Sequence, residues 1–157
     1  MLYIITGEID SGKTFRLLKL YKKHKNADGY ALIKAFENNN YIGQNILWLD
    51  KSITEPFSRI SPGLPFDWIE QESYKEYSFS SFGLTFMAKI YNSLFERLPE
   101  AVFIDDIGPL ELVGGGAADM FSTLLHVKTD IYVSVRQGCI EEFLRYFSIR
   151  NDEYTLI

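Results

Sequence analysis

The chain has 157 residues, of which 46% are hydrophobic and 24% are charged, a composition typical of one ordinary globular domain. The net charge is −5, so the chain lacks the basic footprint of a protein that binds nucleic acid. No apolar run approaches the ~20 residues that span a bilayer, and a single cysteine, Cys139, excludes an intramolecular disulfide. We therefore expect one cytoplasmic domain, residues 1–157, with neither a membrane nor a nucleic-acid partner.

The first elements of the chain are predicted by its apolar pattern. The apolar run at residues 2–6 predicts a strand buried on both faces, and helical spacing predicts a helix over residues 13–25. Residues 29–36 and 41–49 are β-prone and flank the turn signal Glu-Asn-Asn-Asn. These two stretches therefore predict a β-hairpin in the N-terminal half.

Residues 50–78 carry Pro56, Pro62 and Pro65 among scattered aromatic residues. Long segments of this kind in a small domain are usually functional or mobile. We expect this segment to be irregular, to be mobile without nucleotide and to close over a bound ligand as a lid.

The rest of the chain alternates between helical and strand patterns. The expected elements are a helix from Ser80 or Ser81 to Pro99, a strand at 101–104, a helix at 117–125, a strand at 131–135, a helix at 140–147 and a strand at 154–157. This order predicts an α/β domain with a mostly parallel, twisted sheet and helices on both faces.

Residues 7–14 match the P-loop pattern G-x-x-x-x-G-K-[ST] and follow a predicted strand into a predicted helix. The expected nucleotide-binding residues are Gly7, Glu8, Ile9, Asp10, Ser11, Gly12, Lys13 and Thr14. Glycines allow close approach of the backbone, and the loop amides and helix N-terminus attract phosphate. Lys13 is expected to neutralise the β- and γ-phosphates during catalysis, and the Thr14 hydroxyl to ligate Mg²⁺. The motif predicts a nucleoside triphosphate as the bound partner.

The apolar run at residues 101–104 leads directly into Asp105 and Asp106. A strand that ends in an acid after a P-loop is typical of the Walker-B arrangement, so Asp105 is expected to hold Mg²⁺ or its water. Adjacent side chains diverge at the end of a strand. Asp106 is therefore expected to point elsewhere, toward an attacking water.

Three segments give the chain a resemblance to a known family. They are the P-loop at residues 6–14, the sequence Ile-Asp-Asp-Ile-Gly-Pro-Leu-Glu-Leu at 104–112, and Val-Ser-Val-Arg at 133–136. In motifs and spacing the chain resembles the cancer-related nucleoside-triphosphatases, small P-loop proteins of thermophilic microbes and animals. The resemblance implies Mg²⁺-dependent hydrolysis of nucleoside triphosphates with broad base tolerance. It gives Asp105 the metal-binding role and Asp106 the place of the catalytic acid.

Two departures from the family pattern concern the site itself. The family usually has Glu where this chain has Asp106, and the shorter side chain sets its carboxylate back by about 1.5 Å. Such a displacement of a group that positions water can cost about 10²-fold in rate. The family also commonly has Pro-Gly where this chain has Ile9-Asp10. The Asp10 carboxylate either points to solvent or weakens triphosphate binding.

Several further side chains are candidates for the site. Glu111 is either a base near the reacting groups or a surface residue of its loop, and Arg136 either stabilises transition-state charge or forms an ordinary salt bridge. Phe36, Tyr41 and Trp48 are expected to pack within the hairpin rather than to stack on a nucleobase.

The sequence therefore predicts a Mg²⁺-dependent hydrolase of ATP or GTP that is a single P-loop domain, and it indicates no particular protein partner. One alternative is a nucleotide or small-molecule kinase, which would need an acceptor pocket and a lid with several arginines, for which only Arg136, Arg145 and Arg150 are candidates. The other is a nucleotide-sensing module in which Asp106 marks lost turnover.

Overall fold

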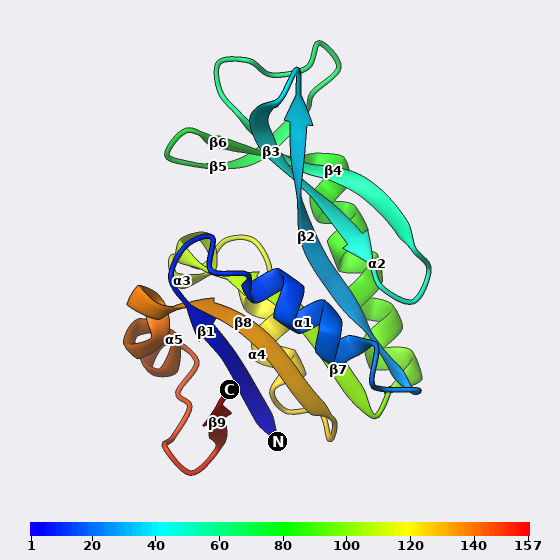
Figure 1. Cartoon of the computed structure of the whole chain (residues 1–157), viewed down its shortest axis with the longest axis vertical. Helices are drawn as coiled ribbons and strands as arrows, with labels where there is room; N and C mark the ends of the chain where they lie inside the picture. Colours follow the sequence, from blue (N-terminus) through cyan, green and yellow to red (C-terminus); the bar gives the residue numbers. More distant parts are fainter.

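In the computed structural model, which describes residues 1–157, strands and helices alternate except for a run of successive strands within residues 27–80 (Figure 1). The elements are β1 (Leu2–Gly7), α1 (Lys13–Tyr21), β2 (Ala27–Glu37), β3 (Asn40–Trp48), β4 (Ile53–Ile60), β5 (Glu70–Tyr74), β6 (Tyr77–Ser80), α2 (Ser81–Arg97), β7 (Ala101–Ile107), α3 (Pro109–Leu112), α4 (Ala118–Leu124), β8 (Asp130–Arg136), the 3-10 helix η1 (Gln137–Cys139), α5 (Ile140–Tyr146) and β9 (Tyr154–Leu156). All strands join one 9-stranded sheet in the order β5-β6-β4-β3-β2-β7-β8-β1-β9. None of the helices is both long enough and apolar enough to cross a bilayer.

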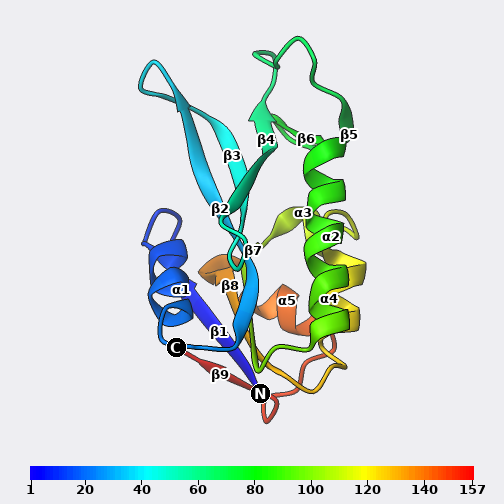
Figure 2. The same cartoon turned by 90° about the vertical axis from the view of Figure 1, so that its right-hand side faces the viewer.

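The sheet is mixed, so the expectation of a mostly parallel sheet is wrong. Strands β2, β7, β8, β1 and β9 pair in parallel, whereas β3, β4, β6 and β5 extend the sheet from β2 by antiparallel pairing. Figures 1 and 2 show the antiparallel half standing above the parallel half. The predicted hairpin is β2–β3, in which Asn38 and Asn39 have φ values of 50° and 62°, the left-handed region that a tight hairpin turn requires.

Residues 50–78 contain more regular structure than their prolines suggest. They include β4, β5 and the start of β6, and the longest part without a strand is residues 61–69. Pro56 lies inside β4 at a position where the β3–β4 register shifts by one residue. Proline cannot donate a ladder hydrogen bond and is tolerated in sheets at such irregularities. The prolines therefore do not prevent this segment from completing the sheet.

Helices cover both faces of the sheet, as the sequence predicts. Alternate residues of each parallel strand enter different clusters: Ile4 and Ile104 join the larger one, and Ile5 and Phe103 the smaller one. The larger cluster packs against α2, α4 and α5, and the smaller cluster packs against α1 through the fully buried Leu17. Figure 2 shows α1 on one side of the sheet and α2 with α4 on the other.

The carboxyl ends of β1, β7 and β8 lie along one edge of the sheet. Strand β8 lies between the other two, and its register places Arg136 beside Gly7 and Val133 beside Ile104. Open α/β sheets bind ligands outside the carboxyl ends of their strands. This topology therefore brings the loop after β1, the aspartates of β7 and the end of β8 together.

Candidate functional site

The predicted phosphate loop, residues 7–14, connects β1 to α1. Gly12 has a φ of 85°, a left-handed value, and α1 begins at the next residue, Lys13. A Cβ on Gly7 would lie 2.3 Å from Ser11 Oγ, so the glycine lets the Ser11 side chain fold back over the end of β1. Residues 9–14 line a cleft, and the loop therefore presents its backbone and the start of α1 to this space.

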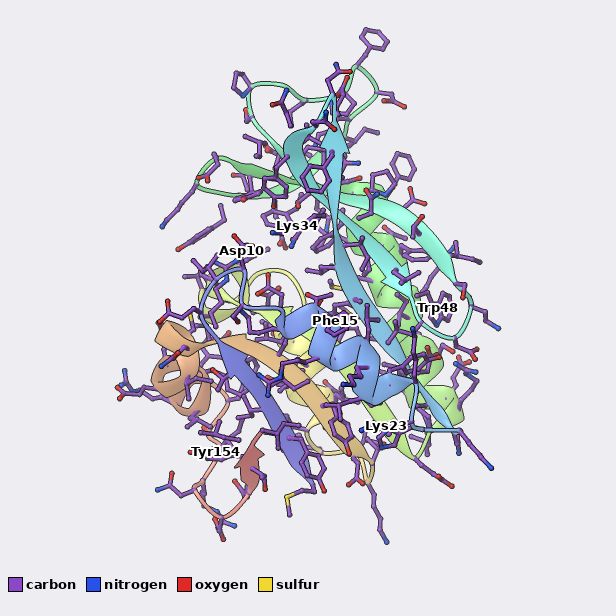
Figure 3. The ribbon with its side chains drawn as sticks, in the orientation of Figure 1. Asp10, Phe15, Lys23, Lys34, Trp48 and Tyr154 are labelled. Carbon is purple, nitrogen blue, oxygen red and sulfur yellow. The ribbon has the colours of Figure 1, made fainter.

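The side chain of Lys13, the first residue of α1, folds back over the preceding loop. Its Nζ donates to the carbonyl oxygens of Glu8, at 2.7 Å, and Gly7, at 3.3 Å. On the same loop, Asp10 accepts a hydrogen bond from Lys34 of β2 at 2.5 Å, and Figure 3 shows these two labelled side chains approaching each other. The Asp10 carboxylate therefore contacts a cation, so the expectation that it points only to solvent does not hold.

Asp105 is the buried carboxylate of the site. Its Oδ2 accepts from Thr14 Oγ1 at 2.7 Å and from the Leu32 amide at 3.0 Å, and its Oδ1 accepts from Ser134 Oγ at 2.5 Å. Only 1% of the residue is exposed. Burial raises the pKa of Asp105 to about 6, although the hydrogen bonds from Ser134 and Thr14 oppose that rise. The strand end therefore holds Asp105 directly against the start of α1.

The contact between Thr14 and Asp105 fits a Mg²⁺ ion. A hydroxyl and a carboxylate are hard oxygen ligands, and Mg²⁺ in nucleotide sites is held by one or two such side chains together with substrate phosphates and water. No group of three or more His, Cys, Asp or Glu side chains in the protein converges into a metal site. Phosphate oxygens and water would therefore have to complete the coordination at Thr14 and Asp105.

Asp106 diverges from Asp105, as predicted, and faces the cleft. Its φ is 53°, and its amide donates to Ser134 Oγ at 2.7 Å. This left-handed turn of the backbone points its carboxylate at Arg136, with an Nε–Oδ1 distance of 3.5 Å. The Asp106 side chain is 21% exposed and that of Arg136 39% exposed. A partly solvated carboxylate and a guanidinium therefore lie side by side at the ends of β7 and β8.

Glu111 is buried, so the alternative of a surface residue is wrong. It lies in the four-residue helix α3, which the sequence patterns do not predict. Its carboxylate accepts from the amides of Gly108, at 3.0 Å, and Ala117, at 3.4 Å. Burial raises the pKa of Glu111 to about 7. Glu111 thus ties the turn after β7 to the start of α4.

The cleft has a volume of about 680 Å³ and extends from the loop to the antiparallel half of the sheet. Tyr41 lines it and lies with its hydroxyl 3.3 Å from that of Tyr77. Phe36 is 60% exposed, so its expected packing in the hairpin core is wrong. Trp48 lies outside the cleft and packs against Phe86 of α2 beside the larger core cluster, so its partner is a helix and not only the hairpin. Tyr41 is therefore the one aromatic candidate of the three that faces the site.

Sequence patterns missed two residues of this site. Ser134 joins Asp105 to the Asp106 amide, and its only sequence signal is a hydroxyl inside the apolar run of β8. Lys34 reaches the loop from β2. The sequence around Lys34 contains no pattern that predicts its contact with Asp10, 24 residues away. Arg145 and Arg150 do not line the cleft, so Arg136 is the arginine that the fold brings to the site.

Two solved structures share this architecture. The crystal structure of THEP1 from the hyperthermophile Aquifex aeolicus aligns with a TM-score of 0.73 and 18% identity, over 100% of this chain and 88% of that one. The solution structure of a human cancer-related nucleoside triphosphatase aligns with a TM-score of 0.66 and 17% identity, over 99% of this chain and 86% of that one. The chain has the fold of these two proteins.

The likeness confirms, at the level of the fold, the resemblance that the motifs carry. It covers the whole chain, including residues 50–78, where the sequence motifs do not extend. No protein-family model matches the sequence, and no curated protein matches it.

Proposed function

We propose that the protein is a Mg²⁺-dependent nucleoside triphosphatase that hydrolyses ATP or GTP to the diphosphate and phosphate. The observation that carries this proposal is the 2.7 Å hydrogen bond between Thr14 and Asp105, which joins the phosphate loop to the end of β7. Asp106 and Arg136 lie beside that contact in the same cleft. The fold shared with a human nucleoside triphosphatase supports hydrolysis as the reaction.

Each side chain of the cleft has a separate role in the proposed phosphoryl transfer. The loop amides and Lys13 bind the β- and γ-phosphates, while Thr14 and Asp105 would hold Mg²⁺. The ion would supply positive charge that offsets the negative charge of the phosphates. Asp106 orients a water toward the γ-phosphorus and accepts its proton, and Arg136 stabilises charge on the transferring group. The new bond forms from the water oxygen to phosphorus as the bond to the β–γ bridging oxygen breaks.

The test is phosphate release from a panel of nucleoside triphosphates, with Mg²⁺ or EDTA and without any added acceptor. The wild-type protein should release phosphate only with Mg²⁺, and Asp106→Asn should reduce the rate by about 10²-fold, the usual effect of losing a general base. Nucleotide binding in the absence of any phosphate release would refute the hydrolase and favour the nucleotide-sensing module.

A kinase is the second candidate because of the cleft itself. The cleft has a volume of about 680 Å³, and its far wall carries the hydroxyl-bearing Tyr41 and Tyr77. Arg136 is, however, the only arginine that lines this space, and a kinase lid usually supplies several. Phosphate transfer that appears only when a hydroxyl-bearing acceptor is added would favour the kinase over the hydrolase.

A further inference from the structure

The Lys34 side chain crosses the cleft from β2 to the phosphate loop. Its Nζ lies 2.5 Å from Asp10 Oδ1, and Figure 3 shows the two side chains meeting above α1. Both residues line the cleft, and their side chains are 50% and 66% exposed. No other ion pair of the protein joins the loop to the antiparallel half of the sheet. The contact is therefore open to a ligand that enters from solvent.

The Asp10 carboxylate contacts Lys34 and lines the same cleft as Lys13 and Arg136. The hydrogen bond and charge of Lys34 lower the pKa of Asp10, and the charges of Lys13 and Arg136 act in the same direction. Lys13 and Arg136 are the cations that a bound triphosphate would meet. A negative charge is thus already present on a side chain of the loop, in direct contact with Lys34 and in the same cleft as Lys13 and Arg136.

A terminal phosphate can displace this carboxylate. Exposed ion pairs between single side chains are weak and are further reduced by salt. A phosphate group carries nearly two negative charges and three acceptor oxygens, so it outcompetes one carboxylate for the same ammonium group. The loop amides bind the inner phosphates. Lys34 extends from β2 on the other side of the cleft, so the phosphate that it contacts is the outermost one.

We propose that Asp10 is a tethered stand-in for the terminal phosphate, and that Lys34 moves from Asp10 to the γ-phosphate of a bound nucleoside triphosphate. This proposal rests on the triphosphate binding proposed above. Its consequence is selectivity, because a diphosphate has no group at the outermost position and leaves Lys34 with Asp10. After the γ-phosphoryl group departs, Lys34 returns to Asp10 and no longer contributes to nucleotide binding.

The test is a double-mutant cycle on nucleotide affinity. Calorimetry would measure the Kd of a non-hydrolysable ATP analogue and of ADP, both with Mg²⁺, for the wild type, Lys34→Gln, Asp10→Asn and the double variant. Asparagine tolerates the left-handed φ of 59° at residue 10, so Asp10→Asn removes charge without straining the loop. Lys89→Gln removes the same charge from an exposed position on α2 and serves as the control.

Lys34→Gln should weaken binding of the triphosphate analogue by roughly 10- to 100-fold, as expected for one charge-assisted hydrogen bond. Its ADP affinity should change no more than that of Lys89→Gln. Asp10→Asn should tighten analogue binding by roughly 2- to 5-fold, because it removes the competing end of an exposed ion pair. That gain should vanish in the double variant, where no Lys34 is present to be released. Thermal unfolding of all variants should match the wild type.

Equal losses for ADP and for the analogue in Lys34→Gln would overturn the assignment to the terminal phosphate. Weaker analogue binding in Asp10→Asn, or a gain that persists in the double variant, would overturn the stand-in role of Asp10. A wild-type protein that binds neither nucleotide would overturn the proposed function as well. Wild-type binding that is lost in Lys13→Ala but unaltered in Lys34→Gln would leave that function intact and refute the present proposal alone.

Discussion

Replacement of Glu111 by glutamine is expected to change how folding stability depends on pH. The Glu111 carboxylate is buried between the amides of Gly108 and Ala117, and a Cβ on Gly116 would lie 2.3 Å from its Oε1. The loop backbone thus packs directly onto the carboxylate and excludes water. Desolvation is accordingly the main cause of the raised pKa of Glu111, and the nearby charge of Asp106 adds to it.

The magnitude follows from the difference between the folded and unfolded states. The pKa of Glu111 rises from 4.5 to about 7 on folding, which corresponds to about 3 kcal/mol of unfolding free energy. Because the folded state holds the proton more tightly, this contribution is fully present below about pH 4.5 and is lost as the pH rises through about 7. Glutamine does not titrate, so Glu111→Gln lacks this contribution at every pH.

The assay is urea unfolding of the wild type and of Glu111→Gln at several pH values between 5 and 8. The stability of the wild type relative to the variant should fall by about 2 to 3 kcal/mol over this range. Glu96→Gln, at an exposed position on α2, is the control and should leave the wild-type pH dependence unchanged. A constant difference between wild type and Glu111→Gln would refute the argument that burial controls this carboxylate.

Three further predictions concern the cleft. Lys13→Ala should weaken ATP binding by at least about 10-fold in calorimetry while the fold survives, and wild-type affinity would contradict the phosphate loop. Asp106→Glu should raise the rate of phosphate release by extending the carboxylate toward the water, and Asp106→Asn should lower it without loss of nucleotide binding. An unchanged rate in Asp106→Asn would transfer the catalytic role to Glu111. Limited proteolysis within residues 61–69 should slow when Mg²⁺ and a non-hydrolysable triphosphate are bound, and cleavage that ignores the nucleotide would argue against a lid.

The parts of the site that sequence predicts are those set by short stretches of chain. The phosphate loop needs Gly7 and Gly12 at fixed positions between a strand and a helix, and Asp105 follows directly from an apolar strand. Once β8 separates β1 from β7, the parallel register brings Thr14 to Asp105. Local pattern and one topological rule therefore account for these residues.

The parts that sequence misses depend on distant pairing. Strands β5 and β6 are short, β4 pairs with β3 through a register shift, and all three lack an apolar run of their own, so their neighbours stabilise them. Lys34 faces Asp10 only because β2 lies beside the loop. Glu111 is buried only because the glycine-containing turn up to Gly116 folds back over it. Neither spacing nor propensity within a short window contains this information.

Three carboxylates, two at the end of β7 and one in α3, differ in their surroundings, and this difference decides which of them can accept a proton from an attacking water. Asp105 is buried and already accepts hydrogen bonds from two hydroxyls and one amide, with its pKa raised to about 6. Glu111 is buried against two amides, and burial raises its pKa to about 7. Asp106 alone keeps a partly solvated carboxylate in the cleft, beside the guanidinium of Arg136. A base must lie within reach of water, and of the three only Asp106 combines a place in the cleft with a partly solvated carboxylate.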